Sequence, residues 1–380
     1  MHAVGSPGLV INNGTVQLAG TGDDQISDSA PVVVNNSGVL DLNAHNEGVG
    51  GLSGNGVVTN NATGTSTLTL GAAGTGGGTF TGSIQDGGTG KKVAVIKNGA
   101  GALTFDGTNT YTGGMTVNGG ALVVNGSLAG SVTVNSTAKL AGPGSIAGGV
   151  TVNSGGTIIP GNPPAALTST GNMMVGGLRL NSGATTQIEL GGTTRGSKYA
   201  AILASNIVEL GGTLNVSLVS YSPTLGDRFD ILDWGTRSGT FSTLQLPALS
   251  GTLGWNTGAL YLNGVLSVID TNFLPGDFDR DGHVNVADIA AMETALADLS
   301  IYRTSHGHMS PAQLVSIGDL DGDGQVTNAD LQALTDLLAN GGGSGAGGLS
   351  VVPEPQSAVL FALGCSIALA WTGSRRSRTA

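Results

Sequence analysis

A short sequence motif rich in Asn and Gly, which we call the Asn phrase, recurs along this 380-residue chain from Met1 to about Ala165. Three of its copies begin at Asn118, Asn135 and Asn153, so the interval between them is short and nearly constant. A repeat this short cannot bury its apolar side chains alone, so successive repeats must stack into one continuous core. The repeat therefore predicts a β-solenoid over residues 1–170, with Gly and Asn supplying the positive φ values at its corners. Its predicted strands are the short β-prone runs before the three phrases: Met115–Val117, Val132–Val134 and Val150–Val152.

The composition agrees with a thin interior of this kind. Gly accounts for 67 residues, while only 4% of the chain is aromatic and 10% is charged, far from average globular usage. Val, Ile, Leu and Thr fill a narrow core without large rings. A collagen-like fold is excluded, because the Gly residues have no strict three-residue period. Cys365 is the single cysteine, so no disulfide forms within the chain and cysteine usage does not indicate the compartment.

The repeat pattern loosens after residue 170, and longer strands are predicted at Thr213–Val219, Phe229–Trp234 and Leu260–Ile269. Aromatic residues concentrate in this part of the chain, as expected where the open end of a sheet must be covered. We interpret residues 171–270 as a β-rich region that continues or caps the solenoid. A separate small β-sandwich is the alternative.

Two twelve-residue stretches, Asp277–Asp288 and Asp319–Asp330, share one acidic pattern. Calcium prefers six to eight oxygen ligands, and an EF-hand-type loop supplies them from positions 1, 3, 5, 7, 9 and 12, with Gly at position 6. Both stretches carry Asp at positions 1, 3, 5 and 12. Position 7 offers a backbone carbonyl, and position 9 offers a side-chain oxygen that binds directly or through water. We therefore predict two Ca²⁺ ions, with the ligands Asp277, Asp279, Asp281, His283, Asn285 and Asp288 in the first loop and Asp319, Asp321, Asp323, Gln325, Thr327 and Asp330 in the second.

Each loop continues into a stretch with apolar residues at helical spacing, and position 12 is Asp rather than the Glu of most EF-hands. This paired arrangement resembles the type I dockerin module over residues 273–339. The resemblance implies a small α-helical calcium module with a cohesin-like domain as its partner. Cellulosomal dockerins carry a cohesin-contacting hydroxyl pair at loop positions 10 and 11. Here these positions are Val286 and Ala287, then Asn328 and Ala329.

The segment between the loops predicts a middle helix, with Ser310 as its N-cap and Pro311 as its first residue. The loops start at Asp277 and Asp319, and this separation indicates an insertion relative to a compact dockerin. Residues Phe273–Leu338 hold 11 acidic and 2 basic residues, a net charge of −9 out of −11 for the whole chain. Bound cations would offset much of this charge. With no basic patch in the chain, we expect no nucleic-acid partner.

The segment KNGAGALTFDGTNTYTGGMTVNGGAL, from Lys97 to Leu122, resembles the autotransporter-associated β-strand repeat. The resemblance implies an exported right-handed parallel β-helix of the kind found in surface passenger proteins.

A Gly-rich linker, residues 340–351, leads to a three-part tail at residues 352–380. The apolar run Ala358–Trp371 is predicted to form a short hydrophobic helix; at 14 residues it is short for a stable span, but it is compatible with transient membrane insertion. The tail resembles the PEP-CTERM sorting signal, which implies an exosortase-type processing enzyme and a Gram-negative envelope. A plain C-terminal anchor is the alternative. The residues of the sorting motif are Pro353, Glu354, Pro355, Arg375, Arg376 and Arg378.

Export requires a signal, and the residues that follow Met1 have neither a charged start nor a sustained apolar core. Because the chain also opens inside a repeat, we expect the natural N-terminus to lie upstream.

Catalysis has little support in the sequence, although parallel β-helices include polysaccharide lyases and hydrolases. Glycoside hydrolysis usually needs two carboxylates that converge on one bond, but most of the 13 acidic residues before residue 271 are isolated. Asp227, Asp230 and Asp233 form a dense group. At strand spacing, Asp227 and Asp233 share one face and Asp230 takes the other, with Arg228 available for local pairing. We interpret this group as a solvated strand and turn, and predict no enzyme.

Together these features predict a mainly β fold: a right-handed parallel β-helix with a β-rich C-terminal cap, a small α-helical calcium module and a short hydrophobic helix. The predicted function is that of an exported, cell-surface or secreted structural or adhesive protein. The alternative is a component of polysaccharide degradation that docks to a cohesin-type scaffold. The expected partners are the exosortase-type enzyme, and a cohesin-like domain or an extracellular polysaccharide.

Overall fold

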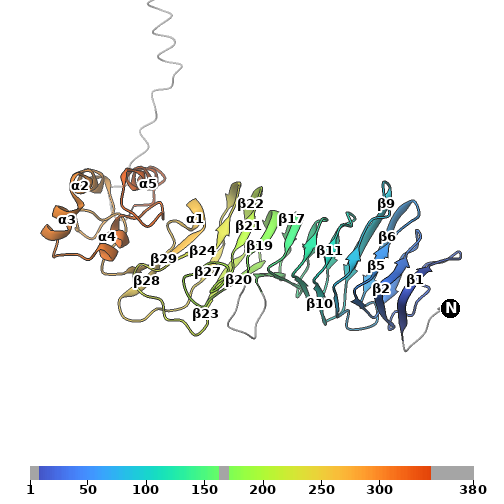
Figure 1. Ribbon diagram of the computed structural model, residues 1–380. Coiled ribbons are helices and arrows are strands. Elements are labelled where there is room, and N and C mark those ends of the chain that lie inside the picture. Colours follow the sequence, from blue (N-terminus) through green and yellow to red (C-terminus); the bar gives the residue numbers. More distant parts are fainter. Residues whose placement is uncertain (1–7, 162–170, 344–380) are drawn as a thin grey trace, which may run out of the picture. The chain divides into compact units, whose positions relative to one another are not determined.

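The computed structural model describes residues 8–161 and 171–343. The chain divides into two compact units, Met1–Thr271 and Asn272–Ala380. Within the described residues, the first unit has 29 strands and one short helix, and the second has four helices (Figure 1). The predicted mainly β class is confirmed. Long parallel sheets are compatible with the predicted parallel β-helix, whose right-handedness remains a prediction.

Two long sheets of 13 strands each run through the first unit, and every strand pair in them is parallel. Successive repeats contribute strands to both sheets, so the sheets grow together along the stack. Sheet 1 consists of β1 (Leu9–Gln17), β2 (Pro31–Asp41), β4 (Gly51–Gly54), β5 (Val57–Thr59), β7 (Gly78–Phe80), β8 (Ser83–Ile84), β10 (Ala102–Phe105), β13 (Ala121–Val124), β16 (Lys139–Gly142), β18 (Thr157–Pro160), β20 (Thr185–Leu190), β23 (Thr213–Leu218) and β27 (Thr243–Gln245). Sheet 2 consists of β3 (Glu47–Val49), β6 (Gly64–Leu70), β9 (Lys91–Lys97), β11 (Thr108–Asn109), β12 (Met115–Val117), β14 (Ser127–Leu128), β15 (Val132–Val134), β17 (Ser145–Val152), β19 (Met173–Leu180), β21 (Ile202–Ala204), β22 (Ile207–Leu210), β25 (Leu232–Asp233) and β26 (Thr236–Gly239).

The sequence repeat sets the register of the sheets, because residues one repeat apart pair with each other. Met115 of β12 pairs with Val132 of β15, and Val132 pairs in turn with Val150 of β17. The three strands predicted before the Asn phrases therefore exist, the last of them as the end of β17. Within β15, Val132 and Val134 are buried while Thr133 is partly exposed. The two-residue alternation of a strand thus places the Val residues of each coil in the common interior.

The prediction of positive φ values at asparagine is confirmed for Asn36 (φ +51°) and Asn43 (φ +47°), but the asparagines of the three regularly spaced phrases do not have them. Positive φ falls two residues later in each phrase, on Gly120, Thr137 and Gly155. The asparagines instead form a ladder in which each side-chain amide donates to the side-chain oxygen of the Asn one coil earlier. Cross-strand pairing of identical residues satisfies these polar groups along the stack. The donor-to-acceptor distances are 2.8 Å for Asn118 to Asn98, 2.6 Å for Asn135 to Asn118, 2.6 Å for Asn153 to Asn135 and 2.7 Å for Asn181 to Asn153.

Lys97 is a buried cation at the end of β9, where the neighbouring coils carry Leu70 and Val117. Its Nζ donates to the backbone carbonyls of Gly99 at 2.6 Å and Gly119 at 3.0 Å. Burial lowers the pKa of Lys97 from its usual 10.5 to about 8. The charged form is therefore less favourable in the folded chain than in the unfolded one.

We expect the stability of the sheets to depend on pH through Lys97. Between pH 8 and 10.5 the unfolded chain binds the Lys97 proton and the folded chain does not, so this residue makes stability rise with pH across that window. The Lys97 contribution between pH 7.5 and 9.5 is about 2 kcal/mol. Lys97→Met should remove this rise, as measured by urea unfolding at the two pH values. The exposed Lys92 on the same strand offers the control: Lys92→Met should keep the wild-type rise, and an unchanged rise in Lys97→Met would contradict the expectation.

The strands β19 to β27 of residues 173–245 pair within the same two sheets as the earlier repeats, except for β24. A third, antiparallel sheet has the order β24-β29-β28, with β24 (Arg228–Asp230), β29 (Val265–Asp270) and β28 (Leu253–Asn256). The strand predicted at Thr213–Val219 is β23. The run predicted at Phe229–Trp234 is instead split between β24 and β25, which belong to different sheets.

The strand predicted from Leu260 begins as a helix, α1 (Leu260–Asn263), before β29. The helix ends at Gly264, whose φ of +81° and 1.7 Å approach of a Cβ position to the Leu232 carbonyl oxygen exclude any other residue. Leu232 is distant from Gly264 in the sequence, so local strand propensity does not predict this contact or the helix that ends there.

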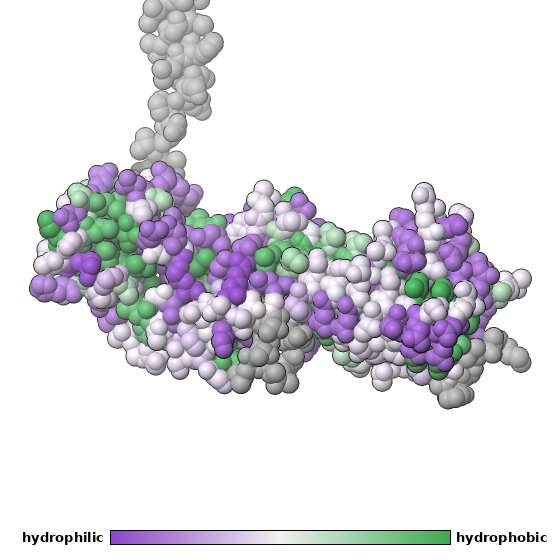
Figure 2. Space-filling view, viewed as in Figure 1, coloured by the Kyte–Doolittle hydropathy of each residue, from purple (hydrophilic) through white to green (hydrophobic). Residues whose placement is uncertain are grey.

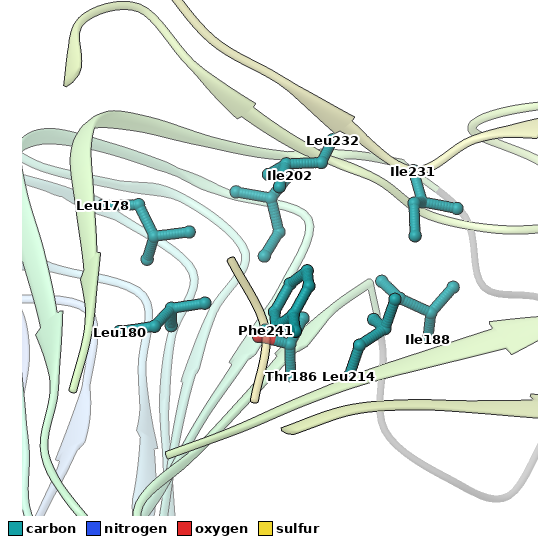
Figure 3. Close-up of a pocket in the computed structure, with 9 residues that line it drawn as sticks. All are labelled: Leu178, Leu180, Thr186, Ile188, Ile202, Leu214, Ile231, Leu232 and Phe241. Carbon is teal, nitrogen blue, oxygen red and sulfur yellow. The ribbon is translucent and has the colours of Figure 1, made fainter. Parts of the chain in front are cut away.

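The interior of this region is packed with aliphatic side chains (Figure 3). They surround a cavity of about 10 Å³, which is about the smallest volume that holds one water molecule. Thr186 is the one polar residue in the lining, so this interior is core and not a ligand site. The lining residues are Leu178, Leu180, Thr186, Ile188, Ile202, Leu214, Ile231, Leu232 and Phe241.

The second unit contains α2 (Val286–Ala297), α3 (Leu299–Ser305), α4 (Pro311–Gly318) and α5 (Asn328–Ala339). The predicted middle helix is α4, and the Ser310 side chain caps it by accepting from the Gln313 N–H at 3.2 Å. In residues 8–161 and 171–343, no helix has the length and apolar character needed to cross a membrane. Most of the predicted linker, the apolar run Ala358–Trp371 and the sorting motif (Pro353, Glu354, Pro355, Arg375, Arg376 and Arg378) lie outside the described residues.

Candidate metal centre

The first acidic loop closes on itself through its own carboxylates. Asp277 accepts from the backbone N–H of Asp281 at 3.1 Å and from that of Gly282 at 3.0 Å. Gly282 has a φ of +86°, the left-handed conformation that the sharp turn at position 6 requires. Asp288, fully buried in the first turn of α2, accepts from the N–H of Phe278 at 2.7 Å and from that of Asn285 at 2.9 Å. Position 12 therefore ties the start of the loop to its end.

The second loop repeats this arrangement at the start of α5. Asp319 accepts from the N–H of Gly324 at 3.1 Å. Asp330 is fully buried and accepts from the N–H of Leu320 at 2.7 Å and from that of Thr327 at 2.8 Å. The same residue types at the same positions thus give the same backbone path, as the sequence pattern predicts.

Both loops pack against one core, because position 8 is Val in each of them. Val284 and Val326 are buried among residues of the helices, including Met292 of α2 and Leu334 of α5. The side chains at position 9 cap these two helices: Asn285 accepts from the Ala287 N–H at 2.8 Å, and the Thr327 hydroxyl accepts from the Ala329 N–H at 3.2 Å. Burial of position 8 and capping by position 9 orient the acidic side of each loop.

Each loop gathers three carboxylates whose oxygens lie within 4.8 Å of one another. Asp277, Asp279 and Asp281 form the group in the first loop, and Asp319, Asp321 and Asp330 form that in the second. Burial raises the pKa of Asp279, and the neighbouring carboxylates of Asp288, Asp281 and Asp277 raise it further. The pKa of Asp321 is raised by burial and then by Asp330 and Asp323. Crowded carboxylate oxygens of this kind suit a hard divalent cation such as Ca²⁺.

The structure brings together three of the four predicted carboxylates in each loop. Asp288 is outside the first group and Asp323 outside the second. Asp281 and Asp323 accept from the N–H of position 7, His283 at 2.8 Å and Gln325 at 2.7 Å. The oxygens that Asn285 and Thr327 would offer at position 9 serve as helix caps. The complete ligand set therefore remains a prediction.

The acidic group of the first unit differs from the arrangement predicted by strand spacing. Asp230 and Asp233 both bind Arg195, Asp233 at 2.8 Å, because the chain bends at Ile231 between β24 and β25. Burial raises the pKa of Asp230 to about 6, against the opposing effect of Arg195. Asp227 points elsewhere and accepts from the Tyr221 hydroxyl. The sequence prediction missed Arg195, which lies 35 residues from Asp230.

The insertion between the two loops is also ordered, which sequence reasoning missed. It forms α3, where Asp298 is the N-cap and accepts from the Ile301 N–H at 3.0 Å. An Asp before a run with apolar residues is a helix-start signal, so this cap was detectable. Tyr302 of α3 reaches the first loop and donates to the Phe278 carbonyl at 2.9 Å.

The second unit, called the helical unit below, also exposes apolar side chains. Val286, at position 10 of the first loop, is 44% exposed, and Ile301 and Leu337 are exposed on α3 and α5. Hydrophobic surface gathers over the helices of this unit in Figure 2. The equivalent position in the second loop is the polar Asn328, so the two loops present different chemistry at position 10.

The fold and the two loops define a mainly β protein with an EF-hand-like acidic module. Residues 275–339 match the family model of the dockerin type I domain, and residues 95–124 match that of the passenger-associated-transport-repeat. Type I dockerin domains bind calcium and recognise cohesin partners. No curated protein matches the chain. The predicted dockerin and autotransporter-type resemblances are confirmed over these segments, while the PEP-CTERM resemblance stays a prediction.

Proposed function

We propose that this protein is an exported structural or adhesive protein of the cell surface, in which a right-handed parallel β-helix carries a calcium-stabilised docking module. The observation that carries the proposal is the pair of crowded carboxylate groups, within a segment that matches the dockerin model. The passenger-repeat match in the stacked sheets supports export and surface location. For the domain boundaries we keep the sequence prediction, with residues 171–270 as a β-rich cap or continuation of the solenoid.

Two Ca²⁺ ions would be held by the twelve predicted ligands, six in each loop. Bound calcium supplies positive charge that offsets carboxylate repulsion in both loops. The chain's own contribution is to hold the carboxylates close together in the folded unit, through the N–H bonds to Asp277 and Asp288 and their counterparts in the second loop. The loops would then set the relative position of α2 and α5.

No reaction is proposed for the stacked sheets. Glycoside hydrolysis needs a free acid and a free base facing one bond. The carboxylates of Asp230 and Asp233 are instead engaged, because Arg195 binds both of them. This ion pairing supports a structural role for the group.

The partner of the helical module would be a cohesin-like domain, and that of the sheets an extracellular polysaccharide. The apolar Val286 and Ala287 in place of a hydroxyl pair favour a partner with an apolar contact surface. The tail would direct the protein to an exosortase-type enzyme in a Gram-negative envelope, with transient membrane insertion. Mass spectrometry of the mature protein tests this step, since an intact Ala380 would rule out processing.

A pull-down with a panel of cohesins, together with a glycan array, tests the proposed function. We expect retention by a cohesin in calcium and its loss in chelator, with no turnover of any polysaccharide. The double variant Asp279→Asn/Asp321→Asn is the control, since it removes one carboxylate at position 3 of each loop. Glycan binding without retention by any cohesin would exclude the alternative, a component of polysaccharide degradation docked to a cohesin-type scaffold. Turnover of a polysaccharide would overturn the non-enzymatic assignment.

A further inference from the structure

The first calcium loop has a support that the second loop lacks. The Tyr302 hydroxyl, on the inserted helix α3, donates to the carbonyl of Phe278 at 2.9 Å in a buried hydrogen bond. Phe278 stands between Asp277 and Asp279, at position 2 of the loop. The equivalent residue of the second loop is Leu320, and within the described part of the chain no side-chain donor reaches its carbonyl. The two loops therefore differ at one defined point.

Tyr302 is itself held firmly in place. Its ring lies against the Phe278 ring, with 5.5 Å between centroids, and against the His306 ring, with 4.2 Å. Both Tyr302 and Phe278 are buried. Asp298 fixes the start of the short helix that carries Tyr302. The hydroxyl is thus presented to the loop by a packed element and not by a free side chain.

Phe278 is held through its backbone N–H, its carbonyl and its ring. Its N–H donates to Asp288 at 2.7 Å, while its carbonyl accepts from Tyr302. Its ring lies beside Gly318, where an added Cβ would come within 3.0 Å of the ring and 2.6 Å of Val326. The backbone that presents Asp277 and Asp279 is therefore fixed in the folded unit. In the second loop, Leu320 has the equivalent N–H bond, to Asp330, but not the bond to its carbonyl.

Resting on the proposed function, we propose that Tyr302 is a positioning residue for the first calcium site. It holds the segment from Asp277 to Asp279, so that the first loop binds calcium more tightly and releases it more slowly than the second. The physical basis is that this hydrogen bond forms only with the folded first loop, so its free energy adds to that of calcium binding at the first site.

Calcium titration of single-site chains by calorimetry tests this proposal. Asp321→Asn leaves the first site and Asp279→Asn leaves the second, each in the full chain. Adding Tyr302→Phe removes only the hydroxyl and leaves a buried carbonyl without its donor. We expect a Kd about tenfold weaker at the first site and a change of less than about twofold at the second. Ser305→Ala is the matched control on α3, because it removes a hydroxyl that bonds within the helix, to the Tyr302 carbonyl; it should leave both Kd values unchanged.

A weakening of both sites alike, or none at the first, would overturn the role of Tyr302. A wild-type chain that binds no calcium would overturn the proposed function instead, so the two failures are distinguishable. Release kinetics provide a test that needs no Tyr302 variant. When the calcium-loaded chain is mixed with a fluorescent chelator, we expect a slow phase that persists in Asp321→Asn and disappears in Asp279→Asn. The opposite assignment of the slow phase would also overturn the proposal.

Discussion

Excess chelator is expected to remove most of the helical circular-dichroism signal while leaving the β signal of the parallel sheets. The four carboxylates Asp277, Asp288, Asp319 and Asp330 are buried in the helical unit, within 4% exposure, and burying like charges is costly unless a cation offsets them. A unit of this size has a small core and commonly needs a metal or a disulfide for stability. Calcium binding energy is then largely folding energy.

The control for this experiment is a chain whose sites are lost without a chelator. The double variant Asp279→Asn/Asp321→Asn in calcium should resemble the chelated wild type, and restored calcium should rescue only the wild type. Equal helicity in calcium and in chelator would show that the module folds without the ion.

Phe105→Ala should destabilise the parallel sheets by about 3–5 kcal/mol. Phe105 of β10 pairs with Phe80 of β7 in the neighbouring coil, and both rings are fully buried. Removing the Phe105 ring leaves a cavity between two neighbouring coils. Because each coil contacts mainly its neighbours, this cavity weakens the continuous core. Urea unfolding of the full chain in chelator, followed by the β signal, reports on the sheets separately from the helical unit.

Thr104→Ala is the matched control for this substitution. Thr104 is adjacent on the same strand, points to the other face and is partly exposed. Its replacement should cost less than about 1 kcal/mol. Similar losses for the two variants would mean that the interior of the stack is not where the alternation of β10 places it.

The repeats and the calcium loops were predictable because their chemistry is local and recurs. A parallel stack in register places each residue above its counterpart, so the nearly constant interval between the Asn phrases is also the pairing of β12, β15 and β17. The loop pattern likewise specifies its own turn, through Gly282 and Gly324. Residues that lie close together in the sequence determine both features.

The features that sequence reasoning missed depend on contacts between distant parts of the chain. The asparagine ladder joins residues of successive coils, so the role of Asn135 emerges only when the coils are stacked. Arg195 meets Asp230 and Asp233 across the stack, which overrides the alternation expected for one strand. Tyr302 lies in α3, in the segment between the two calcium loops that the local sequence pattern predicts to be a loop. In each case a tertiary contact decides where the side chain lies.

The mass of the folded chain, measured under native conditions in calcium, tests the calcium assignment most directly. We expect two calcium ions on the wild-type chain, one on Asp279→Asn, one on Asp321→Asn, and none on the double variant. A wild-type chain without calcium, or the same number of ions on all four chains, would contradict the assignment of the two loops as calcium sites.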